Sequence, residues 1–171
     1  MNSTENIRVT LGIPTYSRLE YLKQSTASAL IQNYPNLEIL ISQNPHPNLA
    51  IRDAITQYCT ELVTKDSRVR YQILPEDKGP PANFNSIAES ASGEYLMMIG
   101  DDDRLLPDAI GSLASAVGPE TVLAFGKRYA IDAEGKRLEQ VNGSPVWFES
   151  AQNQVPHGRL ANPSHGRGGR Q

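Results

Sequence analysis

Three consecutive carboxylates, Asp101, Asp102 and Asp103, are the residues of this sequence best suited to chemistry. They directly follow the apolar run 95–99, which is short enough to be a buried strand of a parallel sheet. Adjacent carboxylates repel one another by roughly 1 to 4 kcal/mol per close pair at surface-like dielectric constants, and a divalent cation that shares their oxygens relieves this repulsion. The alternative is a solvated turn in which an aspartate caps the next helix. Both interpretations place the carboxylates at the carboxyl end of a strand.

The elements that would position these carboxylates alternate between strand and helix along the chain. Strands are predicted at residues 7–13, 37–42, 69–74, 94–99 and 121–125. Helices are predicted from the 15–18 loop to about residue 32, and at residues 48–64, 83–91 and 107–117. A hairpin with its turn at 133–135 is predicted for residues 128–140. This alternation predicts a three-layer α/β/α fold with a mainly parallel sheet.

Loops that follow the predicted strands bring further polar groups toward the three aspartates. Residues 14–18, 43–48 and 100–104 each follow the carboxyl end of a strand, and such loops share one crevice in a doubly wound sheet. Residues 78–85 would add backbone amides at the start of a helix. The cations available there are Arg18, Lys78 and Arg104. A metal-bound diphosphate fits this chemistry, because Mg²⁺ or Mn²⁺ would bridge carboxylate and phosphate oxygens.

Length and composition exclude several other classes of protein. With 171 residues, 39% of them hydrophobic, the chain is long enough for one domain with a substantial core. The net charge of −3 argues against nucleic-acid binding, which usually requires a basic excess. The lone cysteine, Cys59, allows no internal disulfide and is expected to lie in the protein core, on the buried face of a helix, rather than to be reactive. No apolar run approaches the roughly 20 residues of a membrane span, so the expected location is cytoplasmic, with peripheral membrane contact left open.

The two ends of the chain differ from the middle. Residues 1–6 are a polar extension, residues 7–140 carry the predicted α/β domain, and residues 141–171 are rich in Gly, Pro and Arg. We expect this last stretch to be loosely packed or disordered because it has few core-forming residues. His157 and His165 are expected to be solvated side chains of that stretch rather than metal ligands.

Several short segments, taken in order, resemble the N-terminal, nucleotide-sugar-binding half of the inverting family 2 glycosyltransferases, which have the GT-A fold. The segments are residues 13–18, 28–39, 78–79 with 83–85, 92–95, and 101–103 followed by Pro107. The hairpin at 131–135 is similar to the usual continuation of that family. Each segment alone is a weak signal, and their order and spacing carry the resemblance over about residues 7–140.

The resemblance implies roles for particular residues. Asp101, Asp102 and Asp103 would form the DxD-type motif of the family, with Asp102 the main ligand of Mn²⁺ or Mg²⁺, Asp103 a second ligand, and Asp101 nearer the ribose or donor sugar. Asn85 matches the family's helix-start asparagine more closely than Asn83, although helix capping is an alternative role for it. The residues predicted to contact the nucleotide sugar are Pro14, Thr15, Tyr16, Gln43, Asn44, Lys78, Asn85 and Asp101.

The sequence departs from the family pattern at two places. Family members usually carry an aspartate after the second strand that accepts hydrogen bonds from the base, whereas this chain has Gln43 and Asn44. An amide still offers a donor and an acceptor to a uracil edge, but it lacks the charge. The catalytic base of the family lies in its acceptor-binding half, and this chain offers no identifiable candidate, since nothing recommends Asp132 or Glu149.

Two functions follow from the resemblance. The first is transfer of a sugar from a nucleoside-diphosphate sugar, a UDP-sugar being expected, to a hydroxyl acceptor such as a glycan or glycolipid, with inversion and divalent-metal assistance, as in polysaccharide biosynthesis. The alternative is a truncated, non-catalytic nucleotide-sugar-binding module without the acceptor half. An unrelated phosphatase-like or receiver-like domain would need an aspartate after the first strand, where Pro14 and Thr15 stand.

Overall fold

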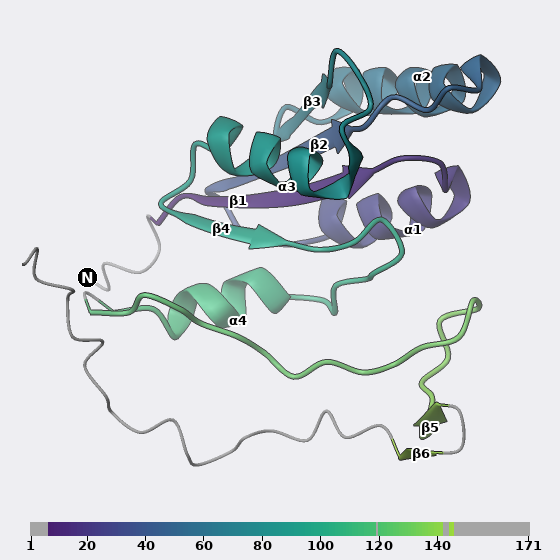
Figure 1. Cartoon of the computed structure of the whole chain (residues 1–171). Coiled ribbons are helices and arrows are strands. Elements are labelled where there is room, and N and C mark those ends of the chain that lie inside the picture. The colour runs from purple at the N-terminus through teal and green to yellow at the C-terminus, as the bar shows by residue number, and fades with distance from the viewer. Residues whose placement is uncertain (1–6, 119, 142–143, 146–171) are drawn as a thin grey trace, which may run out of the picture. The chain divides into compact units, whose positions relative to one another are not determined.

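A computed structural model describes residues 7–118, 120–141 and 144–145 of the chain. It contains two compact units, Met1–Phe125 and Gly126–Gln171. The first unit holds the long elements of Figure 1, which are β1 (Val9–Thr15), α1 (Leu19–Leu30), β2 (Leu37–Gln43), α2 (Leu49–Lys65), β3 (Val69–Ile73), α3 (Gly79–Ser90), β4 (Tyr95–Met98) and α4 (Ala109–Ser115). The second unit contains the short antiparallel pair β5 (Gln140–Val141) and β6 (Ser144–Pro145).

The four long strands form one parallel sheet in the order β3-β2-β1-β4. The chain moves outward from β1 through β2 to β3, and then returns across the sheet to place β4 on the other side of β1. The strand order therefore reverses between β1 and β4, which is where doubly wound sheets open a crevice at the carboxyl ends of their strands. The mainly parallel three-layer fold predicted from the sequence is confirmed.

Alternate residues of the central strands pack against different layers, as the period of a strand requires. Leu11 and Ile39 belong to a core that includes buried residues of α1, α2 and α4. On the other face of the sheet, where Figure 1 shows α3, Ile87 packs directly on the backbone of β1. A Cβ atom on Gly12 would lie 2.4 Å from Cγ2 of Ile87, so this close approach requires glycine.

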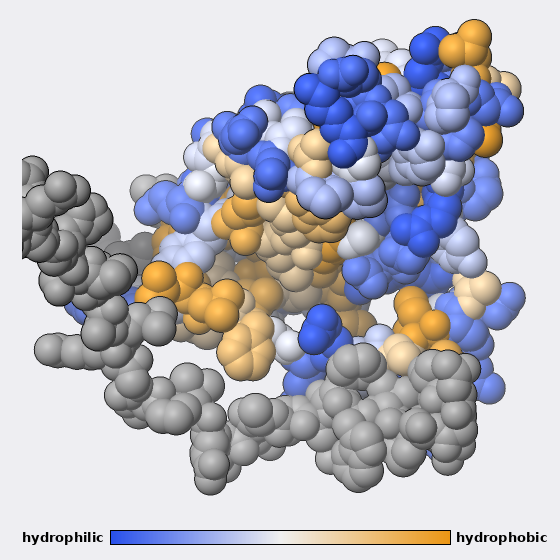
Figure 2. Space-filling model, viewed as in Figure 1, coloured by the Kyte–Doolittle hydropathy of each residue, from blue (hydrophilic) through white to orange (hydrophobic). Residues whose placement is uncertain are grey.

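The β4 edge of the sheet is less buried than its centre. The side chains of β1 and β2 are nearly all buried, whereas those of β4 are half-buried or exposed although they are apolar. Figure 2 shows a band of apolar side chains on this face at the level of β4, and Leu96 and Phe84 are among the exposed apolar residues. Parallel strands are usually covered on both faces, and β4 is covered less completely than its sequence suggests.

The prediction of a fifth strand at residues 121–125 was wrong. These residues form no strand in the structure, and Val122 is 88% exposed. The segment has β-branched and apolar residues, but strand propensity reflects packing against neighbouring strands rather than an intrinsic backbone preference. Without a paired neighbour in the described part of the chain, the same residues remain irregular.

Other boundaries differ by smaller amounts. Helix α3 begins at Gly79, four positions before the predicted start, because Pro80 and Pro81 fit the first turn of a helix, where the missing N–H groups have no helical partner anyway. The predicted turn at 133–135 is present in the second unit, where Gly135 has a φ of +87° and a bridge joins Ile131 to Arg137. The arms predicted for this hairpin at 128–132 and 136–140 form no strand beyond that bridge and Gln140, the first residue of β5. No helix in the described ranges is long and apolar enough to cross a membrane. The predictions for Glu149, His157 and His165 concern residues outside those ranges.

Candidate functional site

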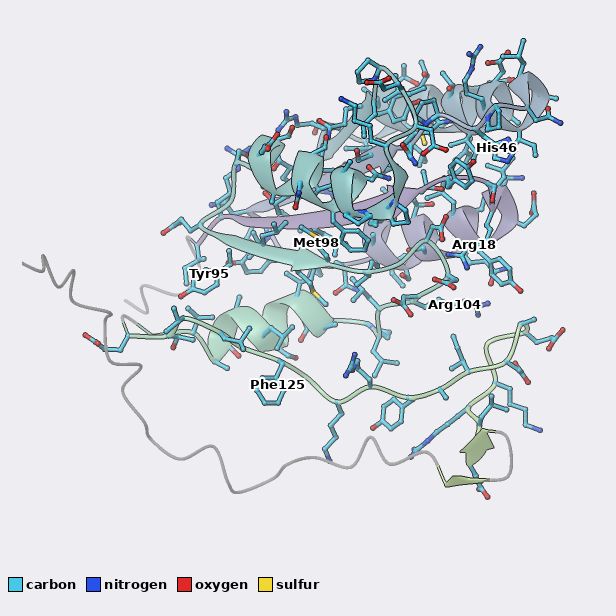
Figure 3. The ribbon with its side chains drawn as sticks, viewed as in Figure 1. Arg18, His46, Tyr95, Met98, Arg104 and Phe125 are labelled. Carbon is cyan, nitrogen blue, oxygen red and sulfur yellow. The ribbon has the colours of Figure 1, made fainter. Side chains whose placement is uncertain are left out.

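A crevice of about 590 Å³ lies at the carboxyl ends of the strands of the first unit. Its lining residues are Pro14, Thr15, Tyr16, Ser17, Arg18, Asn44, Asp77, Gly79, Pro80, Asn83, Phe84, Gly100, Asp101 and Asp102. Figure 3 shows Arg18, His46 and Arg104 at this end of the sheet, and Tyr95 at the opposite end. The loops after β1, β2, β3 and β4 therefore meet at the crevice predicted from the sequence.

Asp101 and Asp102 are held together by one cation. Asp101 is buried, and its carboxylate accepts hydrogen bonds from Thr15 Oγ1, at 2.8 Å, and from Arg18 Nη2. Asp102 accepts from Arg18 Nη1 at 2.6 Å. Burial lowers the pKa of Arg18, but the two carboxylates more than offset burial, so that the pKa of Arg18 is raised above its ordinary value. Arg18 is therefore a fully charged bridge between the loops after β1 and β4.

Asp103 belongs to a different environment from the first two aspartates. Its Oδ2 accepts a hydrogen bond from the backbone N–H of Gly100 at 2.9 Å, and its own N–H donates to the Gly100 carbonyl at 3.1 Å. The side chain of Asp103 is exposed and does not line the crevice. The three consecutive carboxylates thus divide into a bridged pair and a residue that closes a turn.

Helix α1 fixes the loop that carries the aspartates. Ser25 Oγ donates to the Gly100 carbonyl at 3.2 Å, and Ser28 Oγ accepts from the Leu105 N–H at 3.0 Å. Gln32 Nε2 donates to the Leu106 carbonyl at 2.9 Å. The three side chains are buried and spaced three and four residues apart, which places them on one face of the helix and its C-terminal extension. This polar stripe was not predicted from the sequence, because the loop contacts that Ser25, Ser28 and Gln32 make are more than 70 residues away along the chain.

A second polar cluster lies at the other end of the crevice. The rings of Tyr16 and His46 are tilted at 50° with their centroids 4.7 Å apart. Asp77 accepts hydrogen bonds from the backbone N–H of Gly79, at 2.9 Å, and from Asn44 Nδ2. These bonds, with the Gly79 N–H the largest contribution, lower the pKa of Asp77, so the carboxylate is ionised at neutral pH.

Asp77 and His46 were not predicted as site residues. The Asp-x-Gly spacing of residues 77–79 is the sequence signal that could have identified Asp77, because an aspartate accepts readily from the N–H two residues later in a turn. Its bond with Asn44 joins loops that are 33 residues apart, and the sequence gives no sign of that contact.

Two amide oxygens in the crevice wall lack a hydrogen-bond partner among the described residues, Asn44 Oδ1 and Asn83 Oδ1. The orientation of each side-chain amide follows from the hydrogen-bond partners of its N–H₂ group. The Asn44 amide N–H₂ group faces the Asp77 carboxylate, and the Asn83 N–H₂ group donates to the backbone carbonyls of Thr15 and Ser42, at 3.3 and 3.0 Å. Each carbonyl oxygen must therefore face elsewhere, and a buried unpaired acceptor costs about 1–3 kcal/mol. A ligand with N–H or O–H groups would remove that cost.

Of the residues predicted to contact ligand or metal, the structure brings one group together in the crevice. That group is Pro14, Thr15, Tyr16, Asn44, Asp101 and Asp102. Gln43 is placed elsewhere, and its prediction as a ligand contact needs correction. Its side chain is fully buried, with Oε1 accepting from Thr56 Oγ1 at 3.1 Å and Nε2 donating to the Arg52 carbonyl at 3.0 Å. Neighbouring strand residues point to opposite faces, so Asn44 reaches the crevice and Gln43 does not.

The asparagine at the start of α3 also needs correction. Asn83 lies buried in the crevice wall, whereas Asn85, the residue predicted from the resemblance, is exposed and outside the lining. Two residues along a helix correspond to a rotation of about 200°, so the two side chains face opposite directions. Lys78 is likewise outside the lining, and its Nζ forms an exposed ion pair with Glu76 at 3.0 Å.

The donor set of the crevice fits a divalent metal only in partnership with a ligand. Within the described ranges, no group of three or more His, Cys, Asp or Glu side chains converges to hold a metal ion. Asp101 and Asp102 nevertheless offer adjacent carboxylates beside an open crevice. Mg²⁺ is usually held by one or two carboxylates together with substrate phosphates, and not by an all-protein cage. The residues present therefore fit a metal shared with a diphosphate.

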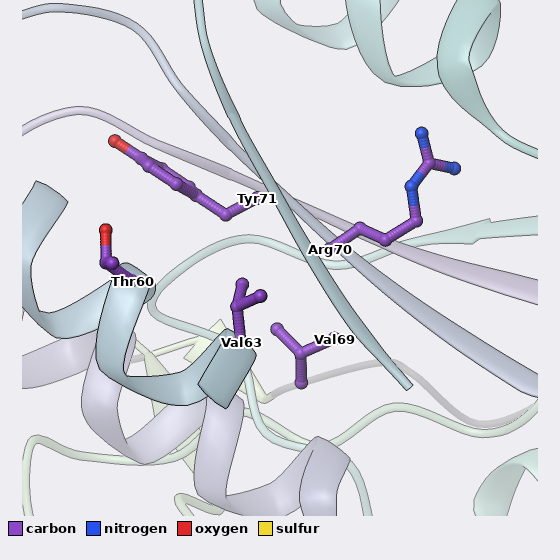
Figure 4. Close-up of a pocket in the computed structure, with 5 residues that line it drawn as sticks. All are labelled: Thr60, Val63, Val69, Arg70 and Tyr71. Carbon is purple, nitrogen blue, oxygen red and sulfur yellow. The ribbon is translucent and has the colours of Figure 1, made fainter. Parts of the chain in front are cut away.

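A second hollow, of about 320 Å³, lies between α2 and β3 and has different chemistry. Thr60, Val63, Val69, Arg70 and Tyr71 line it (Figure 4). Arg70 points away from Tyr71 across the strand, and its Nη1 donates to Glu38 at 2.6 Å. This hollow contains neither carboxylate nor imidazole, so the crevice is the stronger candidate for a functional site.

The sequence matches the model of glycosyl transferase family 2 over residues 10–171, and the chain belongs to this family. The resemblance seen in the sequence is confirmed. Among curated proteins, it is 26% identical to an uncharacterized glycosyltransferase of Haemophilus influenzae over 137 residues, which are 80% of this chain and 53% of that protein. It is 27% identical over 144 residues to the Campylobacter jejuni GalNAc(5)-diNAcBac-PP-undecaprenol beta-1,3-glucosyltransferase, covering 84% of this chain and 45% of that one. The chain thus spans about half the length of these relatives.

Solved structures of glycosyltransferases share the fold. Staphylococcus aureus TarS superposes with a TM-score of 0.56 at 18% identity, over 64% of this chain and 19% of that one. The mannosyltransferase PcManGT of Pyrobaculum calidifontis, solved with GDP-Man and Mn²⁺, superposes with a TM-score of 0.54 at 18% identity, over 64% of this chain and 31% of that one. TarS 1-349 has also been solved with UDP-GlcNAc. The fold is therefore of the GT-A type.

Proposed function

We propose that the crevice binds a nucleoside-diphosphate sugar, with a UDP-sugar as the expected donor, and that the protein transfers its sugar to a hydroxyl acceptor with inversion. The observation that carries the proposal is the Asp101–Asp102 pair at the reversal of strand order, beside two buried amide oxygens that lack partners in the described residues. Membership of family 2 supports the reaction class. The nucleotide sugars in the TarS and PcManGT structures support the donor class.

The residues of the crevice would act on the donor. Tyr16 presents a ring against which a nucleobase stacks. Asn44 and Asn83 accept hydrogen bonds through their unpartnered oxygens, and Thr15 fixes the rotamer of Asp101. Asp102, with Asp101 beside it, would hold Mn²⁺ or Mg²⁺, which neutralises charge on the departing diphosphate. Asp103 and Lys78 stay predictions as further ligands, since both lie near the crevice without lining it.

Transfer also requires removal of a proton from the acceptor hydroxyl, which a carboxylate base performs in general acid–base catalysis. The functional groups assembled in the crevice all serve the donor, and we assign none of them as the base. Because the chain spans about half of its curated relatives, a nucleotide-sugar-binding module without transfer activity is the second candidate function. A glycan or glycolipid acceptor, polysaccharide biosynthesis and a cytoplasmic location at the membrane surface belong to the first candidate.

The donor site is tested by thermal unfolding with UDP, GDP and Mn²⁺, separately and combined. We expect UDP with Mn²⁺ to raise Tm, because a ligand that binds the native state stabilises it by mass action. Asp102→Asn should remove the metal-dependent part of the increase. Asp53→Asn, a change of the same type on the exposed surface of α2, should retain it. Failure of every nucleoside diphosphate to raise Tm would refute the proposed donor site.

The two candidate functions are separated by product analysis. The protein is incubated with Mn²⁺ and UDP-glucose, UDP-GlcNAc or GDP-mannose, with and without oligosaccharide or lipid-linked acceptors. Glycosylated acceptor identifies a transferase. Slow release of the nucleoside diphosphate without glycosylated acceptor, in a protein whose Tm responds to the donor, identifies the binding module.

A further inference from the structure

Arg18 occupies both carboxylates of the crevice at once. Its Nη2 donates to Asp101 Oδ1, and its Nη1 donates to Asp102 Oδ2 at 2.6 Å. The second oxygen of Asp101 accepts from Thr15 Oγ1 at 2.8 Å. Both oxygens of Asp101 therefore have partners, and the accessible carboxylate of the pair is the one that Arg18 holds through Nη1.

The two halves of this bridge differ in how easily they can open. The side chain of Asp101 is 4% exposed, whereas those of Asp102 and Arg18 are 46% and 49% exposed. Exposed ion pairs are weak because water competes for both partners, whereas a buried carboxylate left without its cation is costly. The contact between Arg18 and Asp102 can therefore exchange, and the contact with Asp101 is the one that persists.

A metal ion held by Asp102 would compete with Arg18, because Arg18 Nη1 already donates to the Asp102 carboxylate. The pair of carboxylates and Arg18 together carry a net charge of −1, and a divalent cation would change the sign of this charge. Two cations that share one carboxylate repel each other, and a further anion placed between them offsets that repulsion. A diphosphate supplies that anion, and Arg18 Nη1, once it leaves Asp102, has a hydrogen available for a phosphate oxygen.

We propose that Arg18 is a built-in counter-cation of Asp102, which a metal–diphosphate displaces by exchanging the Nη1 contact from Asp102 to a phosphate oxygen. Metal and nucleoside diphosphate then bind cooperatively, because each removes an obstacle to the other. By linkage, the factor by which the diphosphate tightens the metal equals the factor by which the metal tightens the diphosphate. This inference rests on the proposed donor site and adds to it an internal competitor for the metal.

The test measures Mn²⁺ binding alone and with UDP. Free Mn²⁺ is followed by electron paramagnetic resonance, and UDP binding by calorimetry with and without Mn²⁺. We expect Arg18→Gln to bind Mn²⁺ alone about tenfold more tightly than the unmodified protein, and the coupling between Mn²⁺ and UDP to fall about tenfold, within the range of typical coupling energies. Arg52→Gln removes the same charge from the surface of α2, where Arg52 pairs with Asp53, and should change neither quantity.

If Arg18 is displaced as proposed, Arg18→Gln tightens the binding of Mn²⁺ alone and weakens the coupling between Mn²⁺ and UDP. If Arg18 has only a structural role, the variant weakens the binding of both Mn²⁺ and UDP. Mn²⁺ affinity that is equal or weaker in Arg18→Gln overturns the proposal. If Arg18→Gln fails to fold, Arg18→Lys decides, because lysine keeps the charge without the fork that spans two carboxylates. Tighter Mn²⁺ binding by Arg18→Lys supports the proposal, and unchanged or weaker binding overturns it. If UDP does not bind the unmodified protein, the proposed donor site fails, whereas the comparison with Mn²⁺ alone still decides the role of Arg18.

Discussion

Glu38 and Asp101 are equally buried, each 3% exposed, but they lie at opposite ends of the sheet. Glu38, near the start of β2, accepts from Thr10 Oγ1 and Arg70 Nη1, both at 2.6 Å, and from Ser92 Oγ and N–H, at 2.8 and 3.0 Å. Burial alone would raise the pKa of Glu38, but these hydrogen bonds lower it to about 2. The Glu38 carboxylate, at the amino end of the strands, thus has all of its hydrogen-bond partners within the protein.

Asp101 has fewer hydrogen-bond partners than Glu38, and some buried polar atoms near it have no partner among the described residues. It is held by Thr15 and by the half-exposed Arg18, and the amide oxygens of Asn44 and Asn83 nearby have no partner among the described residues. Buried polar groups in native proteins are normally paired, so exceptions indicate strain or function. Burial of a carboxylate therefore does not by itself indicate a functional site, whereas incomplete pairing of the buried polar groups around it does.

The largest predicted effect on stability comes from Glu38, at the amino end of the strands of the sheet. We expect Glu38→Ala to lower the free energy of unfolding by about 2–4 kcal/mol, because Thr10, Ser92 and Arg70 lose a buried charged partner. Urea denaturation measures the change. Glu89→Ala, on the exposed surface of α3, is the matched control and should change stability by less than about 0.5 kcal/mol. Equal losses in the two variants would contradict a structural role for Glu38.

Lowering the pH should remove the stabilising contribution of Glu38 without a mutation. Folding lowers the pKa of Glu38 from its ordinary 4.5 to about 2, so the ionised carboxylate favours the folded state. Its contribution, about 3 kcal/mol, is complete above the unfolded pKa and is lost as the pH falls through the folded pKa. Urea denaturation between pH 5 and about pH 2 should show this loss, and Glu38→Gln should lose correspondingly less stability over the same interval. An identical acid dependence in both proteins would rule out Glu38 as the cause.

At the carboxyl end, we expect a moderate effect on stability and a distinct one on binding. Asn83→Ala removes the donors to the Thr15 and Ser42 carbonyls and should lower the free energy of unfolding by about 1–2 kcal/mol. It should also weaken UDP binding in the presence of Mn²⁺ by about tenfold. Asn85→Ala, two positions away on the exposed side of the helix, should leave both within about 0.5 kcal/mol. Calorimetry and denaturation decide which asparagine serves the crevice, and a larger effect at Asn85 would restore the prediction made from the family resemblance.

The smallest effect is predicted for Lys78→Ala. The Lys78 amine pairs with Glu76 on the exposed surface, and such pairs contribute about 0–1 kcal/mol. We expect stability to change by less than about 0.5 kcal/mol and the affinity for UDP with Mn²⁺ to change less than about twofold. A tenfold loss of affinity would show that Lys78 turns into the crevice when the diphosphate binds.

The sequence predicted the parallel sheet well because its first four strands are apolar runs bounded by Pro, Gly and polar turns. It failed at 121–125, since pairing with a neighbour decides whether such a segment becomes a strand, and pairing partners far along the chain leave no local signal. The helix was predicted to begin at residue 83, and its true start at Gly79 was missed although Pro80 and Pro81 are favoured in a first turn.

The site was predicted at the level of loops and less well at the level of side chains. Gln43 and Asn44 are adjacent, and the strand period could have shown that only one of them reaches the crevice. The division of the aspartates into a bridged pair and a turn residue depends on Arg18, which the sequence identified only as a nearby cation. Contacts between separate loops of this kind are tertiary, and sequence spacing does not encode them.

Gly12 does not line the crevice, but its lack of a side chain bears on a residue that does. Its missing side chain sets how closely α3 lies on β1 through Ile87, and Asn83 stands one helical turn before Ile87 on the same face. A single added methyl group at residue 12 would act as a wedge under the helix and shift the amide that joins β1 to β2. A substitution at Gly12 is therefore expected to disturb the proposed donor site, although Gly12 itself does not line the crevice.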